Sequence, residues 1–157
     1  MAAGDELRAV LRNVPAPVTV VTVDVEGERL GLTVAAFVSL SLEPPLVGVA
    51  VSRQAAMHEL LRRADAFAVN VLAAGQEHVA QHFARGVPPI GLWEGIEIRE
   101  GATGAPLLEG AAGWLECRRG DVHPAGDHSF FVGEVVAAEA GPAAETLVYV
   151  RQSYSSL

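Results

Sequence analysis

A segment from residue 31 to 46 mixes small and hydroxyl side chains within an apolar, extended pattern. It contains Thr33, Val34, Ala35, Ala36 and Ser39. Small side chains let a flat ligand approach the backbone closely, and free N–H and C=O groups then bond its polar edge. A ring with one polar edge and two apolar faces, such as isoalloxazine, suits this segment. A strand of small packing residues explains the same pattern, so both interpretations stay open.

Two further places in the chain carry candidates for binding a phosphate. Ser52 and Arg53 follow an apolar run and precede a predicted helix. The first turn of a helix has unpaired backbone N–H groups that bind phosphate, and an arginine adds a bidentate charge. Arg85, just after a short predicted helix, is a second candidate. Each arginine is also explained as a solvated surface residue.

A histidine begins a long predicted strand, directly after a turn. In Gly126-Asp127-His128, the histidine is placed to pack against a nicotinamide ring or to donate to its amide. Histidine titrates near neutrality, and Asp127 is placed to orient it. An ordinary turn with an exposed histidine is the alternative.

The remaining reactive side chains give little sign of metal or nucleophilic chemistry. His78 and His82 are four residues apart but have no obvious third ligand, so no metal site is predicted. No Ser-His-Asp arrangement is apparent. The single cysteine, Cys117, excludes an intramolecular disulfide. We expect it to be a small buried residue on a strand, with Glu116 and Arg118 beside it as surface charges.

Length and charge exclude several classes of protein. The 157 residues predict one domain spanning 1–157. No apolar run approaches the roughly 20 residues that span a bilayer, and the start lacks a signal-peptide layout, so a soluble cytoplasmic protein is expected. The net charge is −8, and the closest basic groups are the pairs Arg62-Arg63 and Arg118-Arg119. Such a chain repels phosphate backbones, so no nucleic acid and no anionic membrane is predicted as a partner.

Hydrophobic periodicity predicts a mainly β protein with short helices. Helices are expected over 5–14, over 54–64 and from 75 to 83, and strands over 17–25, 30–42, 46–51, 67–72, 111–119, 128–139 and 146–150. The first two strands form a hairpin, the 46–51 strand is typical of one buried on both faces, and 85–106 is expected to be a loop. Without a Gly-x-Gly-x-x-Gly motif, a doubly wound fold is disfavoured, and a small closed barrel with helices outside is favoured.

Taken in order, these segments resemble the flavin reductase-like, FMN-binding split-barrel proteins, which feed reduced flavin to a partner monooxygenase. The resemblance runs from about Val14 to Leu157. Its matching segments are Pro17–Thr22, Gly31–Thr33, Phe37–Leu46, Phe67–Leu72, Gln81–Ala84, Gly104–Leu108, Gly126–His128, and Leu147–Tyr149 with Tyr154. Each motif alone has low specificity, and their order and spacing together make the resemblance specific.

The resemblance implies a split β-barrel that dimerises and holds flavin near the subunit interface. By position, it implies flavin or phosphate contacts from Thr33, Val34, Ala35, Ala36, Ser39, Ser52, Arg53, Phe83 and Arg85, a catalytic place for His128 near the nicotinamide, and closure of the pocket by Tyr149 and Tyr154. The implied activity is hydride transfer from NADH or NADPH to FMN or FAD. The alternatives are a flavin-binding protein for storage or regulation, and a flavin oxidase acting on a small molecule.

Two departures from the family pattern bear on how tightly flavin is held. Relatives often carry Ser or Asn where this chain has Ala35 and Ala36, and hydroxyls where it has Ala55-Ala56-Met57. A lost neutral hydrogen bond costs on the order of 1 kcal/mol, or about fivefold in affinity. Loose binding suits flavin as a diffusible substrate, and it equally suits a member that has abandoned flavin chemistry.

Overall fold

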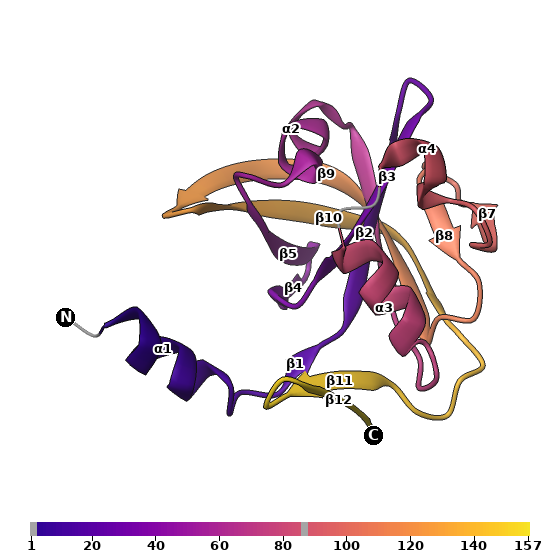
Figure 1. Ribbon diagram of the computed structural model, residues 1–157. Helices are drawn as coiled ribbons and strands as arrows, with labels where there is room; N and C mark the ends of the chain where they lie inside the picture. The colour runs from indigo at the N-terminus through magenta and orange to yellow at the C-terminus, as the bar shows by residue number, and fades with distance from the viewer. Residues whose placement is uncertain (1–2, 86–87) are drawn as a thin grey trace.

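The computed structural model describes residues 3–85 and 88–157, and one seven-stranded antiparallel sheet dominates it (Figure 1). The strands lie in the order β3-β2-β6-β9-β10-β5-β4. Their bounds are β2 (Thr19–Val25), β3 (Glu28–Val34), β4 (Phe37–Leu42), β5 (Pro45–Ser52), β6 (Ala66–Val71), β9 (Gly113–Ala125) and β10 (His128–Ala140). The predicted hairpin is confirmed in its first half, since β2 and β3 pair across the Glu26-Gly27 turn.

Two small sheets and four short helices surround the large sheet in the described residues. The three-stranded sheet contains β1 (Ala16–Pro17), β11 (Leu147–Val150) and β12 (Ser153–Ser156), and the two-stranded sheet contains β7 (Ile98–Glu100) and β8 (Pro106–Leu108). The helices are α1 (Gly4–Leu11), α2 (Ala56–Arg63), α3 (Glu77–Ala84) and α4 (Pro89–Leu92). The predicted mainly β fold with short helices is confirmed. None of the described helices is long and apolar enough to cross a membrane.

The order of the strands forces the large sheet to curl. β3 and β4 form opposite edges of the sheet, yet only Ala35 and Ala36 separate them in the chain. Seven flat strands would set the edges about 29 Å apart, at about 4.8 Å per neighbour. The three Cα–Cα steps from Val34 to Phe37 reach at most about 11 Å. The sheet therefore bends back on itself until its two edges nearly meet, and residues 30–42 form two strands rather than the one predicted.

The curled sheet separates two apolar clusters. Inside it, side chains such as Val21, Val49 and Phe67 pack together under α2. On the outer side, Val20 packs with residues of α3, β8 and β11. Alternation along β2 explains this division, because successive side chains of a strand point to opposite faces. β2 is therefore buried on both faces from Thr19 to Val23.

The strand predicted to be buried on both faces, β5, is only partly so. Its inner side chains Val47, Val49 and Val51 are buried, whereas Ala50 on the other face is half-buried. At Gly48 the ring of Phe130 lies so close that a Cβ atom would clash with it. Phe130 thus supplies the cover at this point of the outer face, and a glycine is required beneath it.

A buried polar network joins the small β8 strand to the large sheet. Asn70 donates to the Val20 carbonyl at 2.9 Å, and its side-chain oxygen accepts from the Leu108 N–H at 2.8 Å. The Thr22 hydroxyl donates to the Pro106 carbonyl at 2.6 Å. Since Asn70 and Thr22 are fully buried, these bonds satisfy groups that water does not reach, and they fix the position of β8.

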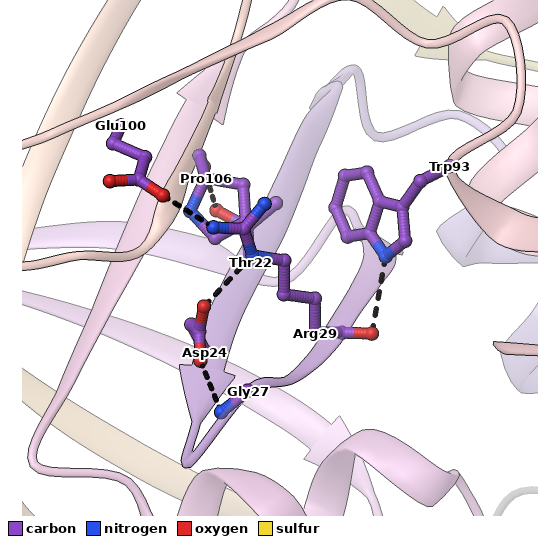
Figure 2. Close-up of polar contacts among 7 residues, drawn as sticks. All are labelled: Thr22, Asp24, Gly27, Arg29, Trp93, Glu100 and Pro106. Atoms are coloured by element: carbon purple, nitrogen blue, oxygen red, sulfur yellow. Dashed lines mark hydrogen bonds and ion pairs between the residues drawn. The ribbon is translucent and has the colours of Figure 1, made fainter.

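Charged residues tie the β2–β3 hairpin to the segment after α3, as Figure 2 shows. Arg29 donates through Nε to Asp24 at 2.8 Å and through Nη2 to Glu100 at 2.6 Å. The Arg29 carbonyl accepts from the Trp93 indole N–H at 3.2 Å. Asp24 also accepts from the Gly27 N–H, which closes the turn. The bond from Arg29 holds the pKa of Asp24 below its ordinary value.

The predicted loop over 85–106 is wrong in part, because α4 and β7 lie within it; residues 86 and 87 are outside the described part of the chain. Cys117 is confirmed as a buried residue on a strand, and burial raises its pKa to about 12. Its neighbour Glu116 is not the surface charge expected, since it is only 7% exposed. Burial by itself raises the pKa of Glu116, but two bonds from Thr103, a bond from the Ala102 backbone and the nearby Arg99 charge together outweigh this and leave the pKa lowered.

The Asp24–Arg29 pair predicts an acid-dependent loss of stability. Because the pKa of folded Asp24 lies below its ordinary value of 3.8, ionised Asp24 stabilises the fold above pH 3.8, and this stabilisation disappears as pH falls through the lower folded pKa. We expect Asp24→Asn to lower the free energy of unfolding by about 1 kcal/mol at neutral pH, and by nothing in strong acid. Urea unfolding across pH measures this, with the exposed Asp121→Asn as control; a difference that persists in strong acid would contradict the ion pair.

Candidate functional site

The Ala35–Ala36 link between the two sheet edges leaves backbone donors unused. The Ala35 carbonyl accepts from Phe37, and the Ala36 carbonyl accepts from Ala50, each at 2.9 Å. In the described part of the chain, the N–H groups of Ala35 and Ala36 donate to no acceptor. Both alanines are exposed, so these two donors are open to a ligand. The expectation of free N–H groups in this segment therefore agrees with the geometry at the link, whereas the expected free C=O groups already accept bonds within the protein.

From this link, a continuous row of residues crosses the end of two strands. Ala36 bonds to Ala50 on β5, and Ser52 follows two residues later, about 7 Å along that strand. Ser52 pairs directly with His128, the first residue of β10. Neighbouring strands lie about 4.8 Å apart. The link, the end of β5 and the start of β10 therefore form one continuous surface. It is long enough for a fused aromatic ring system and a second ring beside it.

A cavity of about 250 Å³ opens beside the link. Thr33, Ala35, Tyr149 and Tyr154 line it, and Pro17, Val18 and Ala84 complete the lining. The two tyrosine rings meet edge to face at 5.0 Å between centroids. The Thr33 hydroxyl donates to the Ala80 carbonyl of α3 at 2.6 Å. That bond holds α3 against β3, so the donor capacity of Thr33 is already used within the protein.

The second group of predicted residues gathers around His128. Its Nδ1 lies 2.7 Å from an Asp127 carboxylate oxygen, and this bond lowers the pKa of Asp127. Because an ionised carboxylate only accepts, the proton of the shared bond belongs to Nδ1, which leaves Nε2 for a ligand. Arg53 donates from its backbone N–H to the Asp127 carbonyl at 3.0 Å. The His128 side chain is 41% exposed, so it is accessible from solution.

Four other predicted residues lie apart from these groups or present only their backbone. Val34 is buried in the inner cluster, so only its main chain faces the link region. Phe83 is 2% exposed, and its ring packs against Gly31 and Trp93 in the outer cluster. Ser39 is exposed on β4, and Arg85 is exposed just after α3, next to the cavity residue Ala84.

A larger cavity, of about 560 Å³, is lined by residues that the sequence did not single out as a group. Arg53 and Arg62 reach it from the α2 side, and Arg119 reaches it from β9. In the sequence these arginines looked scattered, because only the pairing of β9 with β10 and the placing of α2 bring them together. The spacing of His58 and Arg62, four apart on one helix face, was the only local signal.

Comparison with known proteins gives consistent likenesses over nearly the whole chain. The model of the flavin reductase like domain matches residues 11–157. The chain is 42% identical over 147 residues to an NADH-dependent FAD reductase of Streptomyces globisporus, covering 92% of this chain and 80% of that protein. It is 44% identical over 140 residues to the reductase component of a 4-hydroxyphenylacetate 3-monooxygenase of Thermus thermophilus, covering 89% and 87%.

Among solved structures, the chain is similar to the NADH:FAD oxidoreductase of Streptomyces globisporus C-1027 in complex with NAD and FAD fragments. The two superpose with a TM-score of 0.91 and 39% identity, covering 96% of this chain and 90% of that one.

Proposed function

Because the chain belongs to the flavin reductase-like family, we propose that it transfers a hydride from NADH or NADPH to FMN or FAD and supplies the reduced flavin to a partner monooxygenase. The observation that carries this proposal is the pair of open N–H donors at Ala35 and Ala36, in one row with His128. A bound flavin supplies the acceptor for the hydride. The chain's own residues supply binding, orientation and exclusion of water.

The link residues suit the polar edge of a flavin ring. Two exposed backbone N–H groups point to no protein acceptor in the described residues, and the methyl side chains beside them leave room for a flat ring. Backbone donors are fixed by the covalent link between the sheet edges, so they orient a ring without loss of side-chain entropy. Tyr149 and Tyr154 border the adjacent cavity and limit access of water to it.

At the other end of the row, His128 orients the nicotinamide. Its Nδ1 is held by Asp127, so Nε2 is directed by that bond and faces the ligand. A direct hydride transfer needs no acid or base from the protein, and His128 therefore acts by holding the donor ring in place. We infer that Ser52 and Arg53, at the end of β5 beside His128, contact a phosphate of the bound cofactor.

We further propose that the chain, acting as one domain over 1–157 in the cytoplasm, works as a homodimer. α1 has no buried residue and extends away from the sheets (Figure 1). Its apolar residues Leu7, Val10 and Leu11 are each more than half exposed, and Leu42 on the edge strand β4 is 90% exposed. A second copy that covers these surfaces removes them from water, and exposed apolar patches of this kind mark interaction sites.

The central test is a turnover assay on the purified protein with NADH or NADPH and added FMN or FAD, followed by loss of reduced-nicotinamide absorbance. We expect a rate that saturates in both substrates, because each is bound before the transfer. Flavin bound without any turnover would instead support the storage or oxidase alternatives, and the absence of flavin binding would show that the link does not hold flavin.

Filling the space beside the link is expected to weaken flavin binding. Ala35→Leu places a branched side chain where Ala35 now borders the cavity, and we expect the KM for FMN to rise about tenfold, equivalent to about 1.4 kcal/mol. Because Ala35 is exposed, the free energy of unfolding should change by less than about 0.5 kcal/mol. Ala144→Leu, also at an exposed alanine, is the control; an equal effect of both variants would remove the link from the site.

Removing the orienting histidine is expected to impair use of the nicotinamide. For His128→Ala we expect kcat/KM for NADH to fall by one to two orders of magnitude, as is typical when a positioning contact is lost. His123→Ala is the matched control, since His123 is exposed on the same β9–β10 hairpin, opposite Phe130. An unchanged rate at every NADH concentration would exclude His128 from the reaction.

A further inference from the structure

The cavity between α2 and the β9–β10 hairpin concentrates positive charge in a chain whose net charge is −8. Its lining contains Arg53, Arg62 and Arg119 together with His58, and no carboxylate among the described residues. At about 560 Å³ it has the size of a small-molecule site, and it is the largest of the cavities described above. Three arginines around one cavity repel one another, and this repulsion is relieved when an anion binds between them.

Within the described residues, the charges of these arginines are oriented but scarcely neutralised. Arg119 donates through Nε to the Ala64 carbonyl at 2.9 Å and through Nη1 to the Gly120 carbonyl at 2.8 Å. Carbonyl acceptors hold a guanidinium in place but leave its charge intact. Arg62 lies 3.9 Å from a Glu59 oxygen with both side chains largely exposed, and such a pair contributes at most about 1 kcal/mol.

Neutral groups complete the wall of the cavity. His58 is hydrogen-bonded through Nε2 to the Ser129 hydroxyl at 2.7 Å and meets the buried Phe131 ring edge to face. Val122 and Pro124 add apolar surface from β9. A guanidinium cluster beside apolar surface suits a ligand that carries phosphates next to a flat, weakly polar ring.

Arg53 connects this cavity to the row that ends at His128. It lines the cavity, while its Nε lies 3.4 Å from the His128 carbonyl. Successive residues of β10 point to opposite faces, so His128 and the cavity residue Ser129 lie on different faces of the sheet. A ligand whose reactive ring lies by His128 or Ser52 therefore places its phosphates in the cavity by passing around the end of β5 at Arg53. Resting on the proposed function, we propose that this cavity binds the adenosine diphosphate portion of a dinucleotide, with Arg62 and Arg119 as determinants of affinity that FMN does not engage.

FAD and NAD(P)H share this chemical group, and one variant distinguishes them. We expect Arg62→Ala to weaken binding of ADP, measured by calorimetry, about tenfold, as loss of one charge-assisted contact implies. In steady-state kinetics the KM for the dinucleotide that uses the cavity should rise by a similar factor. If only the KM for FAD rises and that for NADH with FMN does not, the source is the flavin; if the KM for NADH rises with either flavin, the source is the nicotinamide dinucleotide.

Arg63→Ala is the matched control, because Arg63 follows Arg62 on α2, is similarly exposed and does not line the cavity. The proposal is overturned if ADP does not bind the wild-type protein, if the two variants bind ADP equally, or if neither KM changes in Arg62→Ala. Calorimetry with ADP needs no turnover, so ADP binding that depends on Arg62 in a protein without reductase activity would refute the proposed function and leave the ADP site standing.

Discussion

The two-residue connection between opposite edges of the sheet is the constraint from which the site follows. A chain that passes from β3 to β4 through Ala35 and Ala36 alone must bring those edges together, and the whole sheet curls to allow it. The edges do not pair with each other in the described residues: β4 pairs with β5 alone, and β3 pairs with β2 alone. A seam therefore remains, and the backbone donors at the seam have no partner in the described part of the chain. The candidate binding surface is thus a product of incomplete closure of the sheet.

Buried polar groups keep the outer elements fixed around this seam. Asn70 and Thr22 fasten β8 to the sheet, and the Thr33 hydroxyl fastens α3 to β3. A buried polar group left without a partner costs about 1–3 kcal/mol, so the bonds of the buried Asn70 and Thr22 select one position of β8 over its alternatives. α3 in turn carries Ala84 to the cavity at the link. The position of the site is thus fixed by hydrogen bonds within the protein, behind the cavity and at its wall.

Much of the fold was accessible from the sequence, because its strands are marked by local residue types. The run from Thr19 to Val25 is rich in β-branched residues, and the Glu26-Gly27 turn has positive φ at both positions, which favours a tight hairpin. The short strands β7, β8 and β12 were missed, since three or four residues become a strand only through a partner. The break at Ala35 was missed for a related reason: both halves have an extended pattern, and only their partners differ.

The candidate site, like the fold, was predictable only where the signal is local in the sequence. The residues of the link and the turn before His128 could be singled out as candidates because small residues and turn residues are local signals. The arginine cavity was missed, since Arg119 reaches it from a strand and Arg62 from a helix, and the charge of the whole chain argued against any basic site. The net charge of a protein governs only how strongly it attracts or repels a distant ligand, and salt screens that interaction beyond about 10 Å. At contact distance the arrangement of a few guanidinium groups decides what binds.

A split between backbone contacts that orient the ring and charged contacts that bind the rest of the ligand explains how a reductase can hold its flavin loosely. At the link, alanines offer no side-chain hydrogen bond, so under the proposed function a flavin ring is held there by two backbone donors and by contact with its faces. Each neutral bond contributes only about 1 kcal/mol, which positions a ring without retaining it for long. An enzyme that delivers reduced flavin to another protein needs both properties, because a product that stays bound is not delivered. If most of the binding free energy comes from charged contacts far from the reacting ring, the ligand is captured there. The contacts that orient the ring for hydride transfer can then stay weak.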